Sequence, residues 1–306
     1  MAIFITGASG FIGGSLARHF IDAGYAVRGL VRSESKAEQL KAMGIEPVLG
    51  TLDDSELLAR EARASEGVIN AADSDHLGAI DAFIEGLQGT GRPLIHTSGS
   101  SVIGDDVGGN ALSPNIFDED TPLIVEPKKA PRHAIDERVR AAASQGIRSI
   151  VLCNTMIYGT GRGLHPDSVQ IPPLVNQARK NGVVRVVGQG INRWSNVHID
   201  DVVALYLLAF ENAPAGSFYF VENGEASYAE IGAAIARRLN LGPVQSWTVD
   251  EAAVEWGRGH AQYSFGSNSR VRAKHARSQL GWQPTHTSIT AWIENEMPLA
   301  SASASA

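Results

Sequence analysis

Short apolar runs alternate with longer amphipathic segments throughout the first half of the chain. The apolar runs have the length of β-strands and predict strands at residues 2–6, 26–31, 46–50, 67–71, 93–97 and 149–154. The segments between them carry apolar residues at helical spacing and predict helices at 11–23, 35–43, 55–63, 76–88 and 132–144. Strands and helices that alternate in this way form right-handed βαβ units around a parallel sheet.

Two helix starts have the form of a capping box, in which a serine is followed three residues later by a glutamate. Ser35 with Glu38 and Ser227 with Glu230 both fit this pattern. Pro131 suits the first turn of the helix near Arg132, because no partner is needed there for its missing N–H.

The alternation becomes less regular after the fifth strand. More than thirty residues rich in Gly, Asp, Pro and Ser separate Thr97 from the helix near Arg132, and connections this long are usually functional or disordered. Beyond Gly159 come a proline-rich helix at 171–181, a strand at 183–188 and several amphipathic helical segments, which together predict a smaller α-rich lobe.

Composition and charge restrict the possible partners. Among 306 residues, 43% are hydrophobic and 19% charged, and the formal net charge of −7 argues against general affinity for nucleic acid. No apolar run reaches the roughly 20 residues that span a bilayer, and the N-terminus resembles no signal peptide. The lone Cys153 can form no intramolecular disulfide, so a reducing, cytoplasmic location is expected. The tail at 299–306, with its SASASA end, is expected to be disordered.

A glycine-rich segment, GASGFIGG, joins the first strand to the first helix. Gly7, Gly10 and Gly13 would allow a tight turn, close approach of the backbone to a pyrophosphate and close packing of the helix on the sheet. A merely tight turn is the alternative. The segment predicts a dinucleotide site whose contacts are Gly7, Ser9, Gly10, Phe11, Ile12 and Gly13.

The residues after the second strand bear on which dinucleotide binds. A carboxylate there would bind the ribose 2′-hydroxyl of NAD, but the chain reads Val31-Arg32-Ser33. Arg32 and Ser33 therefore favour the 2′-phosphate of NADP, with NAD the less favoured cofactor. The alternative is that Arg32 is simply a solvent-exposed arginine.

The motifs taken together resemble the extended branch of the short-chain dehydrogenase/reductase superfamily, which includes the NAD-dependent epimerase/dehydratase enzymes. The resemblance rests on TGASGFIGG, VINAA, HTSGSSVIG, IYG, WSNVHIDDVV and the closing LGW, and covers nearly the whole chain. It implies an α/β class, a doubly wound parallel-sheet Rossmann fold of seven strands with a smaller C-terminal α-rich substrate lobe. The division expected is 1–158 with 194–212 for the Rossmann domain, and 159–193 with 213–298 for the lobe. The matching positions add Ala71, Ala72, Thr97, Ser98 and Arg132 to the expected cofactor contacts.

Active members of that superfamily commonly carry a Ser or Thr after strand five and Tyr-x-x-x-Lys on the next helix. Here Gly99 falls at the serine position, and Lys129 and His133 fall at the tyrosine and lysine positions. This departure is similar to the atypical subgroups, which keep the cofactor fold without the usual catalytic set. Proton transfer is therefore left to Tyr158, His133 or a hydroxyl such as Ser98, Ser100 or Ser101. Arg132, with Lys129 as a second candidate, is assigned to binding.

Each of these assignments has a structural alternative. The Tyr158 ring can pack a turn, the cationic run from Lys128 to His133 can be a solvated helix start, and Arg270 and Arg272 can form a basic helix face rather than line a substrate cleft. The histidines show no metal-ligand spacing, so no metal is proposed.

Two functions follow from these features. The first is an NADP-binding oxidoreductase that transfers hydride to or from a small carbonyl or alcohol, or a sugar-nucleotide-like substrate. The second is a non-catalytic NADP sensor, which the absence of Tyr-x-x-x-Lys favours. The glycine-rich segment, the long connection and the full lobe favour the enzyme. The expected partner is a small molecule, with neither nucleic acid nor membrane, and a homodimer is left open.

Overall fold

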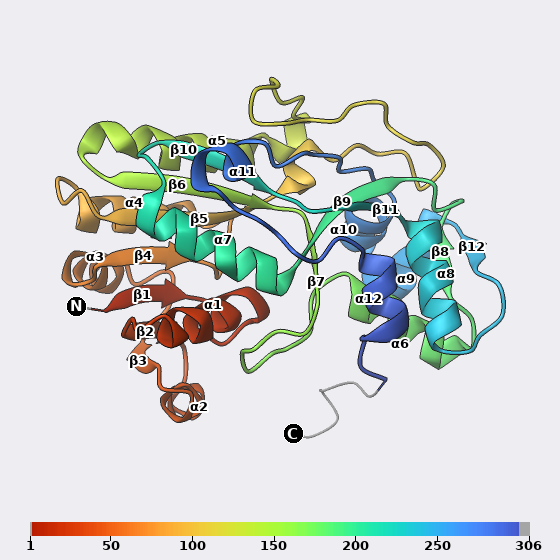
Figure 1. Cartoon of the computed structure of the whole chain (residues 1–306), viewed down its shortest axis with the longest axis horizontal. Helices are drawn as coiled ribbons and strands as arrows, with labels where there is room; N and C mark the ends of the chain where they lie inside the picture. Colours follow the sequence, from red (N-terminus) through yellow and green to blue (C-terminus); the bar gives the residue numbers. More distant parts are fainter. Residues whose placement is uncertain (1, 300–306) are drawn as a thin grey trace.

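Seven parallel strands form the large sheet of the computed structural model, which describes residues 2–299 (Figure 1). Their order, β10-β6-β5-β4-β1-β2-β3, starts near the middle and winds outward in both directions, which confirms the doubly wound fold. Of the expected tail, residues 300–306 lie outside the described residues. The strands are β1 (Ile3–Thr6), β2 (Val27–Val31), β3 (Glu46–Leu49), β4 (Gly67–Asn70), β5 (Pro93–Gly99), β6 (Arg148–Asn154) and β10 (Ser217–Val221).

Alternating side chains give the sheet two apolar faces. In β1, Ile3 and Ile5 enter one core cluster and Phe4 enters the other, as the two-residue period of a strand requires. The first cluster is covered by α1 (Phe11–Asp22), α2 (Glu34–Ala42) and α7 (Ile199–Asn212). The second is covered by α3 (Ser55–Ala64), α4 (Leu77–Leu87) and α5 (Ala130–Ala141). Each buried large side chain contributes about 1.5–3 kcal/mol, so both layers hold the sheet in place.

Helix starts differ in detail from the sequence-based expectation. The expected capping box at Ser35 is wrong, because α2 begins one residue earlier and Ser33 accepts the Lys36 backbone N–H at 3.4 Å. The box of Ser227 and Glu230 is confirmed at the start of α8 (Tyr228–Arg238). Pro131 lies in the first turn of α5.

The seventh strand comes from residues that the sequence division assigned to the lobe. β10 pairs in parallel with β6, with Ser217 opposite Ile150, and thereby forms one edge of the large sheet. By contrast, β9 (Arg193–His198) lies outside that sheet, between β7 (Met156–Tyr158) and β11 (Glu225–Ser227).

The lobe has a core of its own. Tyr158, Tyr228, Phe265 and Trp292 are among its buried side chains. It lies beside one end of the large sheet, at the right of Figure 1. Its further elements are α6 (Ile171–Asn181), β8 (Arg185–Val187), β12 (Gln245–Trp247), α9 (Val249–Trp256), α10 (Arg258–His260) and α12 (Ile289–Asn295). The short α11 (His275–Leu280) packs against β10 and α7.

The long connection between β5 and α5 ties the sheet to the lobe. Phe117 forms an isolated parallel bridge with Val271, and its N–H donates to the Arg270 carbonyl at 3.0 Å. The Asp105 carboxylate accepts the Asn268 backbone N–H at 2.7 Å. The connection is therefore held by hydrogen bonds to residues 268–271.

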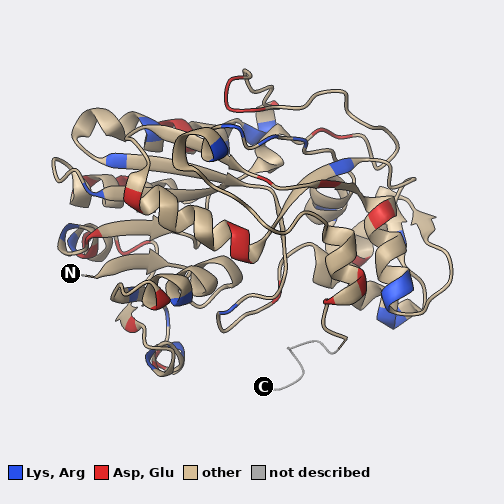
Figure 2. Ribbon diagram, viewed as in Figure 1, with Lys and Arg blue, Asp and Glu red and all other residues tan. Residues whose placement is uncertain are grey.

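Residues of both charges occur in both parts of the molecule. Lys and Arg are interspersed with Asp and Glu along the elements of the sheet domain and of the lobe (Figure 2). Within residues 2–299, no helix is long and apolar enough to cross a bilayer.

Candidate active site

A cleft of about 540 Å³ opens at the C-terminal ends of β1, β2, β3 and β4. Parallel strands present the loops that follow them along one edge, which is where open α/β sheets bind ligands. The cleft is lined by Gly7, Ser9, Gly10, Leu30, Val31, Arg32, Lys36, Thr51, Leu52, Asp53, Ala71, Ala72, Asp73 and His76.

The glycine-rich segment is fixed by close backbone approaches. Gly7 has a φ of +70°, and a Cβ there would lie 2.5 Å from the Ala71 carbonyl oxygen. A Cβ on Gly13 would lie 2.3 Å from the Gly7 oxygen. Gly10 differs, because the nearest atom to a Cβ there would be the Gly7 oxygen at 3.3 Å, and Gly10 lines the cleft. Gly10 is also the uncapped N-terminus of α1, so the first-turn N–H groups remain available to an anion.

Two cations line the end of the cleft beside β2 and α2. Arg32 and Lys36 both contribute to its wall, whereas Ser33 is occupied in capping α2. Across the cleft, His76 Nε2 lies 3.1 Å from Asp53 Oδ1. Sequence reasoning missed Lys36, Asp53 and His76. The sequence feature that could have identified them is that they follow the C-terminal ends of β2, β3 and β4, where ligands of such sheets bind.

The remaining expected cofactor residues do not line this cleft. Phe11 begins α1 and packs under Gly161, where a Cβ would lie 2.6 Å from the Phe11 ring. Gly13 and Ile12 follow it in the helix. Thr97 Oγ1 accepts the Tyr206 hydroxyl at 2.9 Å.

Arg132 lies beyond the end of β5 and bridges two loops. Its Nε donates to Asp75 Oδ1 at 2.7 Å, its Nη2 donates to Asp75 Oδ2, and its Nη1 donates to Ser101 Oγ at 3.0 Å. This pairing raises the pKa of Arg132 and lowers that of Asp75. A Cβ on Gly99 would lie 3.8 Å from Arg132 Nη1 and 3.9 Å from Ser101 Oγ. Arg132 and Ser101 thus surround the position that matches the superfamily's serine.

Ser98 and Ser100 are both buried. Ser98 Oγ donates to Asp136 Oδ2 at 2.8 Å, beneath the sheet edge. Ser100 Oγ accepts the Ser269 hydroxyl at 2.7 Å, with Ser100 fully buried. Neither hydroxyl lines the cleft, so we leave both out of the proposed active site.

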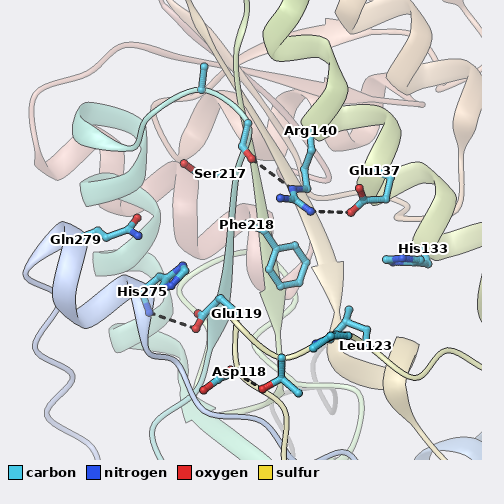
Figure 3. A pocket seen from close by; sticks show the side chains of 14 residues that line it. Asp118, Glu119, Leu123, His133, Glu137, Arg140, Ser217, Phe218, His275 and Gln279 are labelled. Carbon is cyan, nitrogen blue, oxygen red and sulfur yellow. Dashed lines mark hydrogen bonds and ion pairs between the residues drawn. The ribbon is translucent and has the colours of Figure 1, made fainter.

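Tyr158 and His133 lie apart from the cleft and from each other. Tyr158 is 0% exposed in the lobe core, its hydroxyl donates to the His286 carbonyl at 3.4 Å, and burial raises its pKa. His133 lines a separate cavity of about 510 Å³ between α5, β10 and α11, with Arg140 and Phe218 (Figure 3). The four expected catalytic residues are therefore not brought together.

Two other arginines considered for the substrate cleft share one carboxylate, that of Glu225. Arg270 donates to both carboxylate oxygens of Glu225 at 3.0 Å, and Arg272 donates to the same carboxylate at 3.2 Å. Glu225 begins β11, so these bonds hold residues 270–272 against that strand.

A buried polar chain runs under the ends of β1, β4 and β5. Thr6 Oγ1 donates to Asn70 Oδ1 at 2.6 Å, and Asn70 Nδ2 lies 3.3 Å from His96 Nδ1. His96 Nε2 and Asp136 Oδ1 face each other at 3.6 Å, and neither has a hydrogen-bond partner among the described residues. Burial lowers the pKa of His96 to about 4 and raises that of Asp136 to about 7.

With a glycine-lined cleft at the strand ends of a doubly wound sheet, the chain has the architecture of a dinucleotide-binding protein. The model of the NAD dependent epimerase/dehydratase family matches residues 3–221, and the chain belongs to that family. The expected kinship with extended short-chain dehydrogenases is thereby confirmed.

Individual relatives span most of the chain. An uncharacterised protein of Schizosaccharomyces pombe is 35% identical over 302 residues, covering 94% of this chain and 97% of that protein. Oxidase ucsJ of an Acremonium species is 31% identical and covers 95% of each. A 4-hydroxy-2-methyl-3-oxo-4-farnesyl-3,4-dihydroquinoline-1-oxide ketoreductase of Stigmatella aurantiaca is 29% identical, covering 73% of this chain and 69% of that protein.

Among solved structures, the chain is similar to the dTDP-glucose 4,6-dehydratase DesIV of Streptomyces venezuelae. The TM-score is 0.76 at 20% identity, with 96% of this chain and 95% of that one covered. That structure has NAD bound. At this identity the likeness shows the fold alone.

Proposed function

We propose that the protein is an NADP(H)-dependent oxidoreductase that interconverts a small carbonyl compound and its alcohol. The observation that carries this proposal is the cleft itself, which has an uncapped helix N-terminus at Gly10 and two cations, Arg32 and Lys36, further along its wall. The names of an oxidase and a ketoreductase among the relatives support redox chemistry in either direction.

The residues of the cleft fit the parts of an NADP molecule. Ser9, Gly10 and the first turn of α1 would hold the pyrophosphate, because free N–H groups and the helix dipole favour anions there. Arg32 and Lys36 would hold the 2′-phosphate, since NADP adds a dianion where NAD has a hydroxyl. When bound, the cofactor supplies or accepts the hydride.

Arg132 and Ser101 would act on the substrate oxygen. The guanidinium stays charged at any working pH and can stabilise the negative charge that develops on a carbonyl oxygen during reduction. The Ser101 hydroxyl, fixed by Arg132, can donate its own hydrogen to the same oxygen and be reprotonated from solvent. Asp75 orients the guanidinium from the opposite loop. The lobe, residues 159–193 and most of 213–298, is proposed to enclose the substrate.

The test is a turnover screen of ketones and aldehydes with NADPH, followed by the Arg132→Ala variant on any substrate found. We expect NADPH oxidation by the wild type and a loss of about 10²–10³-fold in kcat for the variant, as for a removed oxyanion donor. Arg138→Ala serves as control, because that arginine pairs with Asp81 on the exposed side of α5. NADPH binding without turnover on any carbonyl would overturn the enzymatic proposal and favour a sensor.

A further inference from the structure

The start of α5 gathers three cations, and two of them are paired with carboxylates. Lys128 Nζ lies 3.1 Å from a Glu126 carboxylate oxygen and 3.9 Å from one of Asp106. Arg132 is paired with Asp75. The third cation, Lys129, lies between them along the chain.

Lys129 has no counter-ion. It is partly buried, and within residues 2–299 no carboxylate forms an ion pair or hydrogen bond with its ammonium group. The nearest aromatic ring, that of Tyr263 from the lobe, has its centroid 5.2 Å from Lys129 Nζ. Burial, and then the charges of Arg132 and Lys128, lower the pKa of Lys129, while Glu126 and Asp75 oppose them more weakly. A partly buried ammonium that has no carboxylate partner gains a charge-assisted contact when an anion joins it.

The phosphates of the cofactor do not meet this need. The proposed pyrophosphate site lies at the end of β1, whereas α5 begins beyond the end of β5, two strands away in the sheet. At the usual strand spacing this separation is about 10 Å. An anion at Lys129 would therefore come from another molecule, bound beside Arg132 and Ser101.

We propose that Lys129 binds a carboxylate of the substrate, and that the substrate is a small oxo acid or the corresponding hydroxy acid. This inference rests on the proposed function, in which Arg132 contacts the oxygen of the reacting carbonyl. Lys129 and Arg132 are three residues apart on one helical stretch, so their Cβ atoms are about 5–6 Å apart. Two side chains so placed can contact one small molecule that carries a carboxylate close to its carbonyl.

Binding to the complex with NADP⁺ tests the inference without any need for turnover. The probes are 3-oxohexanoate and its methyl ester, which differ in charge but not in the carbonyl, titrated by calorimetry. We expect the acid to bind the wild type at least about tenfold more tightly than the ester, as for one charge-assisted contact. Lys129→Met should remove that preference, and Lys129→Arg should keep it because the charge remains.

Lys128→Met is the matched control, because its charge is already neutralised by Glu126 and the acid preference should survive. Equal binding of acid and ester by the wild type would overturn the inference. It would also be overturned if Lys129→Met kept the preference, or if Lys129→Arg lost it as fully as Lys129→Met does. If the acid binds with Lys129-dependent preference but is never reduced, the proposed reaction fails while the carboxylate site stands.

Discussion

Arg32 and Lys36 are the two side chains on which the choice of cofactor depends. A contact between a guanidinium and a phosphate contributes about 1.5–3 kcal/mol, and NAD offers no such group at this point. We expect NADP(H) to bind at least about tenfold more tightly than NAD(H), and Arg32→Ala to remove most of that difference. Calorimetric titration of both cofactors measures it.

The control for this prediction is Arg60→Ala, which removes an exposed arginine of α3 without touching the cleft. Equal affinity of the wild type for both cofactors would show that Arg32 is an exposed surface residue, the alternative that its sequence context allows.

The facing pair of His96 and Asp136 makes stability depend on pH in two opposite ways. The pKa of Asp136 is raised to about 7, so between pH 4 and 7 the folded chain holds a proton that the unfolded chain has released, and stability falls as pH rises. The pKa of His96 is lowered to about 4, so its contribution is full above pH 6.5 and is lost as pH falls toward 4.

Asp136→Asn separates these two effects, because it removes the carboxylate but keeps an oxygen that can accept from Ser98. We expect the melting temperature of the variant, relative to the wild type, to rise by several degrees between pH 5 and pH 8. Differential scanning fluorimetry at a series of pH values measures the difference. A difference that does not change with pH would mean that Asp136 keeps one protonation state across this range.

At the scale of elements, the glycine-rich segment gives the sharpest test of where the dinucleotide lies. A side chain at Gly10 would meet only the Gly7 oxygen, at 3.3 Å, and would otherwise project into the cleft. Gly10→Val should therefore leave the protein folded and abolish binding of both NADP and NAD. Circular dichroism and calorimetry check the two halves of this statement.

Gly242→Val is the matched control, because an added Cβ there meets no atom within 4 Å and the site is far from the glycine-rich segment in the chain. If Gly10→Val still binds either dinucleotide with normal affinity, the pyrophosphate lies elsewhere.

The sequence predicted the elements of the first half well, because each strand there is bounded by turn residues and each helix has an amphipathic period. The helices and strands observed begin and end within three residues of their expected positions. β10 was missed because its Ser-Phe-Tyr-Phe-Val run lies just after residue 212, where the sequence division placed the start of the second part of the lobe. Local pattern does not tell which sheet a strand joins.

The candidate site was predicted unevenly for a similar reason. Gly7 and Gly10, which line the cleft, were predicted from their spacing together with their place between a strand and a helix, because local backbone geometry specifies such glycines. Tyr158 was selected because it lies in a turn where members of the family approach the nicotinamide and the substrate, but the packing of Trp292 and His198 around its ring follows from the lobe's tertiary structure. Lys129 lacks a counter-ion only because Glu126 and Asp75 are engaged elsewhere, which no spacing reveals.

At the scale of the whole molecule, Asp201 joins α7 to the C-terminal part of the chain. Its carboxylate accepts the backbone N–H groups of Thr285 and His286, each at 2.9 Å, and is 5% exposed. Asp201→Ala would leave both donors without this partner, and we expect a loss of about 2–4 kcal/mol in the free energy of unfolding, measured with urea.

Asp200→Ala is the neighbouring control, because the Asp200 side chain is half exposed and its ion-pair partner within residues 2–299 is the nearby His198. An equal loss of unfolding free energy in both variants would indicate that the substitutions destabilise helix α7 itself, and that the bonds from Asp201 to residues 285 and 286 contribute little.

The position of β10 in the sequence, far beyond the other six strands of its sheet, affects the order in which the sheet is synthesised. Six strands of the sheet are complete at Asn154, but the seventh begins at Ser217, after β7, α6, β8 and β9 of the lobe have been synthesised. At ribosomal speeds of roughly 5–20 residues per second, the outer edge of β6 waits roughly 3–13 s for its neighbour. During that interval the nascent chain presents the backbone groups of an apolar strand to its surroundings, and a chaperone that shields this edge would act before the lobe is finished.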